Sequence, residues 1–124
     1  GVAAVTDQPA PLLVCIDAAG RTARSVEANH AFSVSTLSVG DQAIADIFAG
    51  RAGLEGRDRF SVGSWDTLET GCPVLTTGLV AFDCRLMDSR IVATHFVIIG
   101  EIVAIRLGQT APALVYSNRS YHAL

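Results

Sequence analysis

The segment from Gly20 to Ser25 carries residue types that could hold a phosphate group. Gly20 permits close approach of a ligand to the backbone, and Arg21 and Arg24 supply positive charge. A helix that begins here would add free backbone N–H groups, to which anions bind readily. A buried phosphate requires donors of this kind, because burying an unpaired charge is prohibitive. The alternative interpretation is a solvated loop with surface arginines.

The residue patterns of several common catalytic sites are absent from the sequence. It contains no GxxxxGK[ST] loop, no GxGxxG dinucleotide motif, no HExxH zinc motif and no GxSxG nucleophile turn. Residues 63–66 (GSWD) lack the second glycine of such a turn and are interpreted as an ordinary loop. The three histidines, His30, His95 and His122, do not have metal-ligand spacing, so no metal site is predicted. Difficult chemistry would therefore belong to a bound organic cofactor.

The composition is that of one small and apolar domain. The chain has 124 residues, of which 50% are hydrophobic and 17% are charged. One core is expected for this length, so residues 1–124 are predicted to form a single domain. The apolar excess favours a large buried interface with a second copy, because a domain of this size leaves much of its surface in water. We expect a homodimer.

Charge and cysteine usage restrict the partners and the location. The net charge is −3 and no cluster of basic residues occurs, so a nucleic-acid partner is not expected. The apolar run at residues 96–100 ends at Glu101, far too early to span a membrane. The three cysteines form no CxxC pair, which favours a reduced, cytoplasmic protein, and we expect all three to be buried packing residues. The chain opens without a methionine in an apolar segment, and we expect that an N-terminal piece is missing.

The first part of the chain is predicted to form short strands and a short helix. Residues 2–6 and 12–16 have β-type composition and are separated by a turn that contains two prolines. Residues 22–28 could form a short helix after a loop. Residues 31–37 alternate weakly between apolar and polar side chains, which indicates a strand.

The clearest helix is predicted over residues 41–49. Ser38 and Asp41 resemble a capping box. Ile44, Ile47 and Phe48 fall on one helical face, and the glycine at position 50 provides a stop.

The rest of the chain is predicted to be mostly β. Residues 51–59 form a polar loop, and residues 79–86 and 96–105 are long apolar strands joined through residues 87–94. Residues 113–116 could form a final strand. Strands that are apolar at nearly every position are typical of burial on both faces, here between the interior and a partner subunit.

A series of short segments, in order along nearly the whole chain, resembles the flavin reductase family. Within that family the sequence is most similar to the reductase components of 4-hydroxyphenylacetate 3-monooxygenases. The segments are 5–9 (VTDQP), 12–15 (LLVC), 48–51 (FAGR), 58–60 (DRF), Trp65, 70–75 (TGCPVL), 82–85 (FDCR), 94–95 (TH), 100–103 (GEIV), 114–116 (LVY) and 121–124 (YHAL).

The resemblance implies a mostly β fold, a Greek-key split barrel with one or two short helices that dimerises around a flavin. It implies hydride transfer from NADH or NADPH to FMN or FAD, followed by release of reduced flavin to a separate monooxygenase. His95 is expected to position the flavin and nicotinamide rings rather than to transfer protons. The residues expected to contact the cofactors are Ala4, Asp17, Ala18, Ala19, Gly20, Arg21, Thr22, Ser35, Phe48, Arg51, His95, Tyr121 and His122.

The sequence also departs from the family pattern. Ala4 and Ser35 stand where Ser and Asn are usual, and residues 17–19 read DAA where an NRS-type loop is common. The N-terminal helix and strand of the family precede the point at which this chain begins. These losses of side-chain donors motivate an alternative hypothesis, a split-barrel protein that binds flavin or another planar ligand without turnover.

Overall fold

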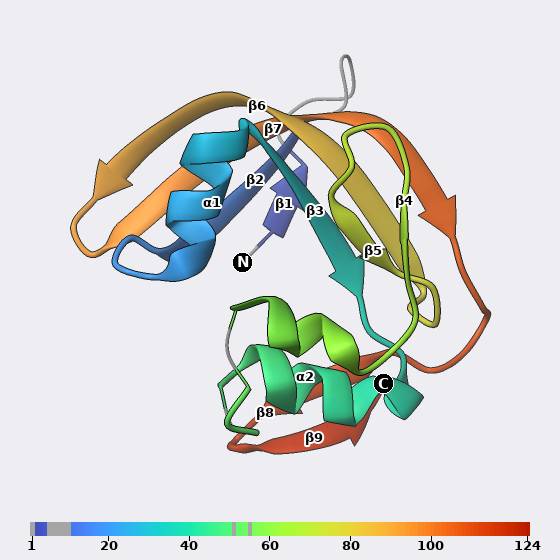
Figure 1. Ribbon diagram of the computed structural model, residues 1–124. Helices are drawn as coiled ribbons and strands as arrows, with labels where there is room; N and C mark the ends of the chain where they lie inside the picture. The colour runs from blue at the N-terminus through green and yellow to red at the C-terminus, as the bar shows by residue number, and fades with distance from the viewer. Residues whose placement is uncertain (1, 5–10, 51, 55) are drawn as a thin grey trace.

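The computed structural model describes residues 2–4, 11–50, 52–54 and 56–124. Its main element is a five-stranded antiparallel sheet of strand order β1-β2-β7-β6-β3 (Figure 1). The prediction of a mostly β chain with a few short helices is confirmed. The strands of this sheet are β1 (Val2–Ala4), β2 (Pro11–Asp17), β3 (Ala31–Thr36), β6 (Val80–Val92) and β7 (His95–Leu107).

Strands β6 and β7 form a long ribbon that curls across the molecule (Figure 1). A tight turn at residues 93–94 joins them, and Ala93 adopts a left-handed φ of 54°. The register shifts between Asp83 and Cys84 and again between Leu86 and Asp88. Such irregularities bend a strand and increase its twist, which accounts for the curl.

The sequence predicted two shorter strands joined through residues 87–94, and this boundary is wrong. Residues 87–92 continue β6, although Asp88, Ser89 and Arg90 are polar. They are exposed, so the polar side chains face solvent while the backbone still pairs with β7.

Two helices accompany the sheet. Helix α1 (Arg21–Asn29) buries Ala23 and Val26 and ends at His30, whose left-handed φ of 53° lets its N–H bond to the Val26 carbonyl at 2.9 Å. A short 3₁₀ turn, η1 (Val39–Asp41), leads into α2 (Gln42–Phe48). The predicted capping pair is confirmed, because the Ser38 N–H and hydroxyl both donate to the Asp41 carboxylate at 2.9 Å.

The core lies between α1 and the sheet. Phe32 sits so closely against the backbone of Gly100 that a Cβ at position 100 would collide with the Phe32 ring. Glycine is therefore required on β7 at this point. The buried members of this core are Leu12, Ala23, Val26, Phe32, Cys84, Phe96 and Ile98.

Two small hairpins and a second 3₁₀ segment complete the fold. The hairpins are β4 (Trp65–Thr67) with β5 (Pro73–Leu75), and β8 (Leu114–Ser117) with β9 (Ser120–Ala123). The segment η2 (Gly56–Ser61) occupies part of the stretch predicted as a loop. Hydrogen bonds of 2.9 and 3.0 Å, from the Val39 N–H to the Pro112 carbonyl and from the Leu114 N–H to the Leu37 carbonyl, tie the C-terminal hairpin beside α2.

Candidate functional site

A cleft of about 650 Å³ is lined by residues of α1 and β3 and by residues of α2 and η2. Small-molecule sites typically occupy about 300–1,000 Å³. A second recess of about 620 Å³, between α1 and η2, adjoins the cleft. The residues that line both are Ser25, Asn29, Arg57, Arg59 and Phe60.

One wall of the cleft is aromatic. The ring centroids of Phe48, Phe60 and Trp65 lie 4.9–5.4 Å apart in edge-to-face and tilted arrangements. Such pairs stabilise one another beyond simple burial. The Trp65 indole N–H donates to the Val62 carbonyl at 2.9 Å, which fixes the indole ring. The wall gives the cleft a rigid apolar surface suited to a planar ligand.

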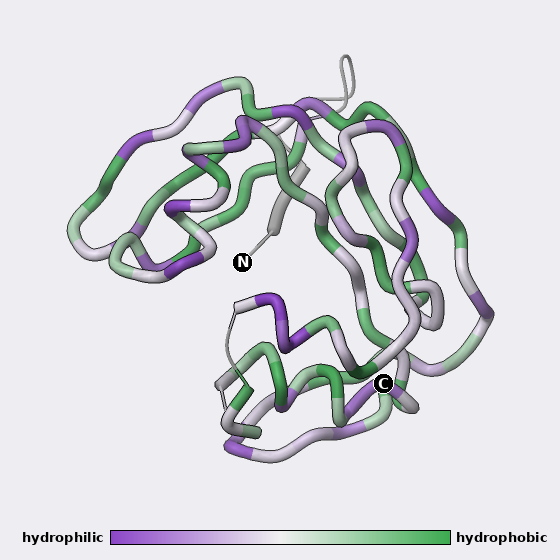
Figure 2. Tube along the Cα trace, viewed as in Figure 1, coloured by the Kyte–Doolittle hydropathy of each residue, from purple (hydrophilic) through white to green (hydrophobic). Residues whose placement is uncertain are grey.

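The charged residues that line the cleft and the recess, within the described part of the chain, are all arginines: Arg21, Arg24, Arg57 and Arg59. Arg59 lies over the ring of Phe48 at 4.9 Å and near that of Phe60 at 6.0 Å. Figure 2 shows hydrophilic stretches on both α1 and η2, beside the more apolar strands. This combination favours a ligand with a planar apolar part and an anionic part.

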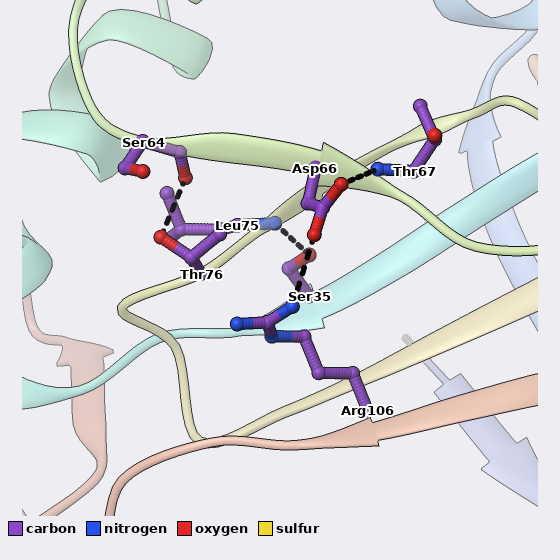
Figure 3. Close-up of polar contacts among 7 residues, drawn as sticks. All are labelled: Ser35, Ser64, Asp66, Thr67, Leu75, Thr76 and Arg106. Carbon is purple, nitrogen blue, oxygen red and sulfur yellow. Dashed lines mark hydrogen bonds and ion pairs between the residues drawn. The ribbon is translucent and has the colours of Figure 1, made fainter.

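Polar contacts join β3 to the β4–β5 hairpin, which also contributes to the lining (Figure 3). The Ser35 hydroxyl accepts a hydrogen bond from the Leu75 N–H at 3.2 Å. On the other side of the hairpin, the Asp66 carboxylate pairs with the Arg106 guanidinium of β7 at 3.3 Å. The Thr76 hydroxyl donates to the Ser64 carbonyl at 3.1 Å. These contacts fix the hairpin on the sheet and hold Leu75, a lining residue, in place.

A buried carboxylate anchors the loop that precedes β5. Asp83 on β6 is 0% exposed. It accepts hydrogen bonds from the N–H groups of Glu69 and Thr70, at 2.8 and 2.7 Å, and from the Thr70 hydroxyl at 2.5 Å. Sequence reasoning missed these partners, because they lie more than ten residues away along the chain in a loop without a motif. These three hydrogen bonds to Asp83 fix the chain just before Cys72 and Pro73, which line the cleft.

Burial shapes the chemistry of the neighbouring cysteine. The pKa of the Cys84 thiol is raised from 9.0 to about 12, first by burial and then by the nearby Asp83 and Cys72. Cys84 therefore stays protonated at neutral pH and serves as a small core residue, as predicted. Cys15 and Cys72 are partly exposed, so the expectation that all three cysteines are buried is wrong.

The predicted anion-binding loop folds into a compact turn before α1. The Asp17 carboxylate accepts from the Ala19 N–H at 2.9 Å, and the Asp17 carbonyl accepts from the Gly20 N–H at 3.2 Å. Gly20 has φ of −79°, an ordinary value for any residue. Arg24 donates to the Ala19 carbonyl at 3.1 Å and so closes the loop.

The predicted His95 lies beside this loop. It begins β7 directly opposite Asp17, and the Ala18 N–H donates to the carbonyl of Thr94 at 3.1 Å. The His95 ring is exposed, and its Nδ1 lies 3.2 Å from the Thr94 hydroxyl. The fold therefore brings two predicted segments together, residues 17–20 and 94–95, at one end of β2 and β7.

The remaining predicted residues fall in different places. Thr22, Ser35 and Phe48 line the cleft, and Arg21 lines the recess. Ala4 pairs with Leu12 in the sheet. Arg51 lies outside the described residues.

The C-terminal pair, Tyr121 and His122, lies on β9, and neither residue lines the cleft. The Tyr121 hydroxyl donates to the Asp46 carboxylate of α2 at 2.8 Å, and its ring packs on Tyr116 at 5.0 Å. His122 is exposed, with Nε2 3.1 Å from the Ser120 hydroxyl. Within this chain Tyr121 anchors the terminal hairpin to α2, whereas the contacts of His122 lie within the hairpin.

Neither a metal-binding cluster nor a membrane-spanning helix is found among the described residues. No group of three or more His, Cys, Asp or Glu side chains in residues 2–4, 11–50, 52–54 and 56–124 could hold a metal ion. In the same ranges no helix is long and apolar enough to cross a membrane.

Comparison with known proteins gives a consistent family assignment. The family described as "Flavin reductase like domain" matches residues 1–124. FMN reductase (NADH) RutF of Ancylobacter novellus is 41% identical over 123 residues, 99% of this chain and 67% of that protein. A protein of Haemophilus somnus named as a flavin reductase has 39% identity and a TM-score of 0.92, covering 99% of this chain and 78% of that one.

A more distant structure shares the fold alone. BorF, the flavin reductase component of a bacterial two-component tryptophan halogenase, is 24% identical with a TM-score of 0.89. The alignment covers 99% of this chain and 78% of BorF.

Proposed function

Because the chain belongs to the flavin reductase family, with its split-barrel fold, we propose that it oxidises NADH and transfers the hydride to FMN. The observation that carries the proposal is the cleft, in which an aromatic wall adjoins a set of arginines. These residues fit a planar ring with a phosphate. The relative from Ancylobacter novellus, at 41% identity, is named as an NADH-dependent FMN reductase, which agrees with this choice of substrates.

The protein's contribution to such a reaction is binding and orientation. A flavin supplies the hydride chemistry when it is bound, and the chain holds the two substrates in contact and limits access of water. Phe48, Phe60 and Trp65 orient a planar ring, while the N-terminus of α1 and the arginines offset phosphate charge. No proton transfer by a side chain is required.

The site residues inferred from the family form part of this proposal. Loop residues 17–20 and His95 lie together at one end of β2 and β7, and they are proposed to contact the flavin there. Thr22, Ser35 and Phe48 are proposed contacts within the cleft. Ala4, Arg51, Tyr121 and His122 complete the proposed set on the strength of the family resemblance.

The proposal includes a homodimer in the cytoplasm that supplies reduced flavin to a separate oxygenase. Met87, Ile91 and Val92 of β6 are 53–67% exposed, and Ile105 and Leu107 of β7 are 54% and 82% exposed. Exposed apolar side chains thus lie at both ends of the β6–β7 ribbon, where a second copy of the chain would bury them. BorF, which shares the fold, belongs to a two-component halogenase system. Sedimentation velocity tests the dimer, and a monomer at micromolar concentration would contradict it.

Steady-state oxidation of NADH or NADPH with FMN, FAD or no flavin tests the function. We expect FMN-dependent turnover that is faster with NADH than with NADPH. Absence of turnover with every flavin would refute the reductase. If FMN still bound without turnover, the protein would be a non-catalytic binding protein, the alternative that the lost side-chain donors at Ala4, Ala19 and Ser35 motivate.

A further inference from the structure

The recess beside the cleft is built from two segments that approach each other with like charge. Helix α1 contributes Arg21 and Arg24, and η2 contributes Arg57 and Arg59. The α1 residues were expected from the sequence to face a phosphate, whereas the η2 residues were not. We propose that Arg57 and Arg59 form the second half of a phosphate-binding site, which receives the anionic part of a ligand whose ring occupies the cleft.

The charge balance of the recess supports an anionic ligand. Among the described residues that line it, no aspartate or glutamate is present. Asp58 and Glu27 belong to the same two elements, but neither lines the recess or the cleft. An anion bound between α1 and η2 would be attracted by the guanidinium groups on both sides. Guanidinium groups suit phosphate because they donate two parallel hydrogen bonds.

Arg59 is already held in a binding conformation. Its Nε–H donates to the Gly56 carbonyl at 3.0 Å, and its guanidinium rests over the rings of Phe48 and Phe60. Within the described contacts, hydrogen bonding uses only this Nε and leaves the terminal nitrogens available. A fixed side chain loses little freedom when a ligand binds, which favours affinity.

Arg59 also joins the two parts of the site. It lines both the cleft and the recess, as do Arg57 and Phe60. A ligand that places a ring against the aromatic wall would therefore place an attached phosphate within reach of η2. The inference rests on the proposed function for the ligand class. The phosphate could belong to FMN or to the pyrophosphate of NADH, and the two share this chemistry.

The first arm of the test compares FMN with riboflavin, which lacks the phosphate. Affinities are measured by titration for the wild-type protein and for Arg57→Gln and Arg59→Gln. If the flavin phosphate binds here, the preference for FMN over riboflavin falls by about 10-fold or more, as expected for loss of a charged hydrogen bond. Arg90→Gln is the matched control, because Arg90 is an exposed arginine of β6 outside both linings.

The second arm compares NADH with a phosphate-free dihydronicotinamide as hydride donor. If the dinucleotide pyrophosphate binds here, KM rises by about 10-fold for NADH, and the change is confined to NADH. If Arg59→Gln fails to fold, Arg57→Gln still tests the inference, because Arg57 is exposed and lies outside the aromatic stack. Equal weakening of phosphate-bearing and phosphate-free ligands in both arms, or no weakening, overturns the inference. The binding arm needs no turnover, so an inactive protein that still prefers FMN would refute the reductase and leave the phosphate site standing.

Discussion

Replacing Asp83 with alanine tests whether a single buried carboxylate holds one wall of the cleft. The substitution leaves the N–H groups of Glu69 and Thr70 and the Thr70 hydroxyl without their acceptor. Each hydrogen bond to a charged group contributes about 1.5–3 kcal/mol, but the loop donors are only partly buried and would regain water. We therefore expect a loss of about 3–5 kcal/mol in the free energy of unfolding, typical of breaking a buried polar network.

Urea unfolding followed by the fluorescence of Trp65, the only tryptophan, measures this loss. The midpoint should fall while the slope with urea stays constant, because the surface exposed on unfolding is nearly unchanged. Asp66→Ala is the matched control: its carboxylate is exposed and pairs with Arg106 at 3.3 Å, so about 1 kcal/mol or less should be lost. A double-mutant cycle with Thr70→Val should show coupling between Asp83 and Thr70. Equal losses for the Asp83 and Asp66 variants would refute the reasoning.

Further predictions concern the core, the pH dependence of stability and the C-terminal hairpin. Gly100→Ala should lower the free energy of unfolding by about 1–3 kcal/mol in urea titrations, because the new methyl group meets the ring of Phe32; an unchanged midpoint would contradict this. The Cys84 thiol has a pKa of about 12 when folded and 9.0 as its ordinary value, so the unfolded chain releases its proton first as the pH rises. Stability should therefore decline from about pH 9 towards 12, and Cys84→Ala should remove that part of the decline. Tyr121→Phe removes the hydrogen bond to Asp46, and a loss of about 1–2 kcal/mol is expected in the same titration; no loss would mean that the hairpin is held by other contacts.

The sequence predicted those elements whose signal is local. The Ser38 and Asp41 pair and the apolar face of α2 are contained within a few residues, and both appear in the structure. The second half of β6 was missed because its polar residues reflect exposure rather than a turn. Strand β9 was missed because the two-residue turn that joins it to β8, at Asn118 and Arg119, lacks the glycine that usually marks such turns, although both residues have a positive φ.

Only that part of the candidate site whose signal is local could be predicted from the sequence. The α1 arginines stand next to a helix start and carry a recognisable anion-binding pattern. Arg57 and Arg59 lie in a stretch predicted as a polar loop, and only the fold brings η2 against α1. The aromatic wall combines α2, η2 and β4, elements that no sequence spacing connects.

The central claim is that this chain transfers a hydride from NADH to FMN. Anaerobic mixing of the protein and FMN with substoichiometric NADH, followed by flavin absorbance, tests that claim directly. We expect rapid loss of oxidised flavin absorbance, with one FMN reduced for each NADH consumed. The reduction should be far faster than in the absence of the protein. Unchanged flavin and NADH, in a sample that binds FMN, would contradict it.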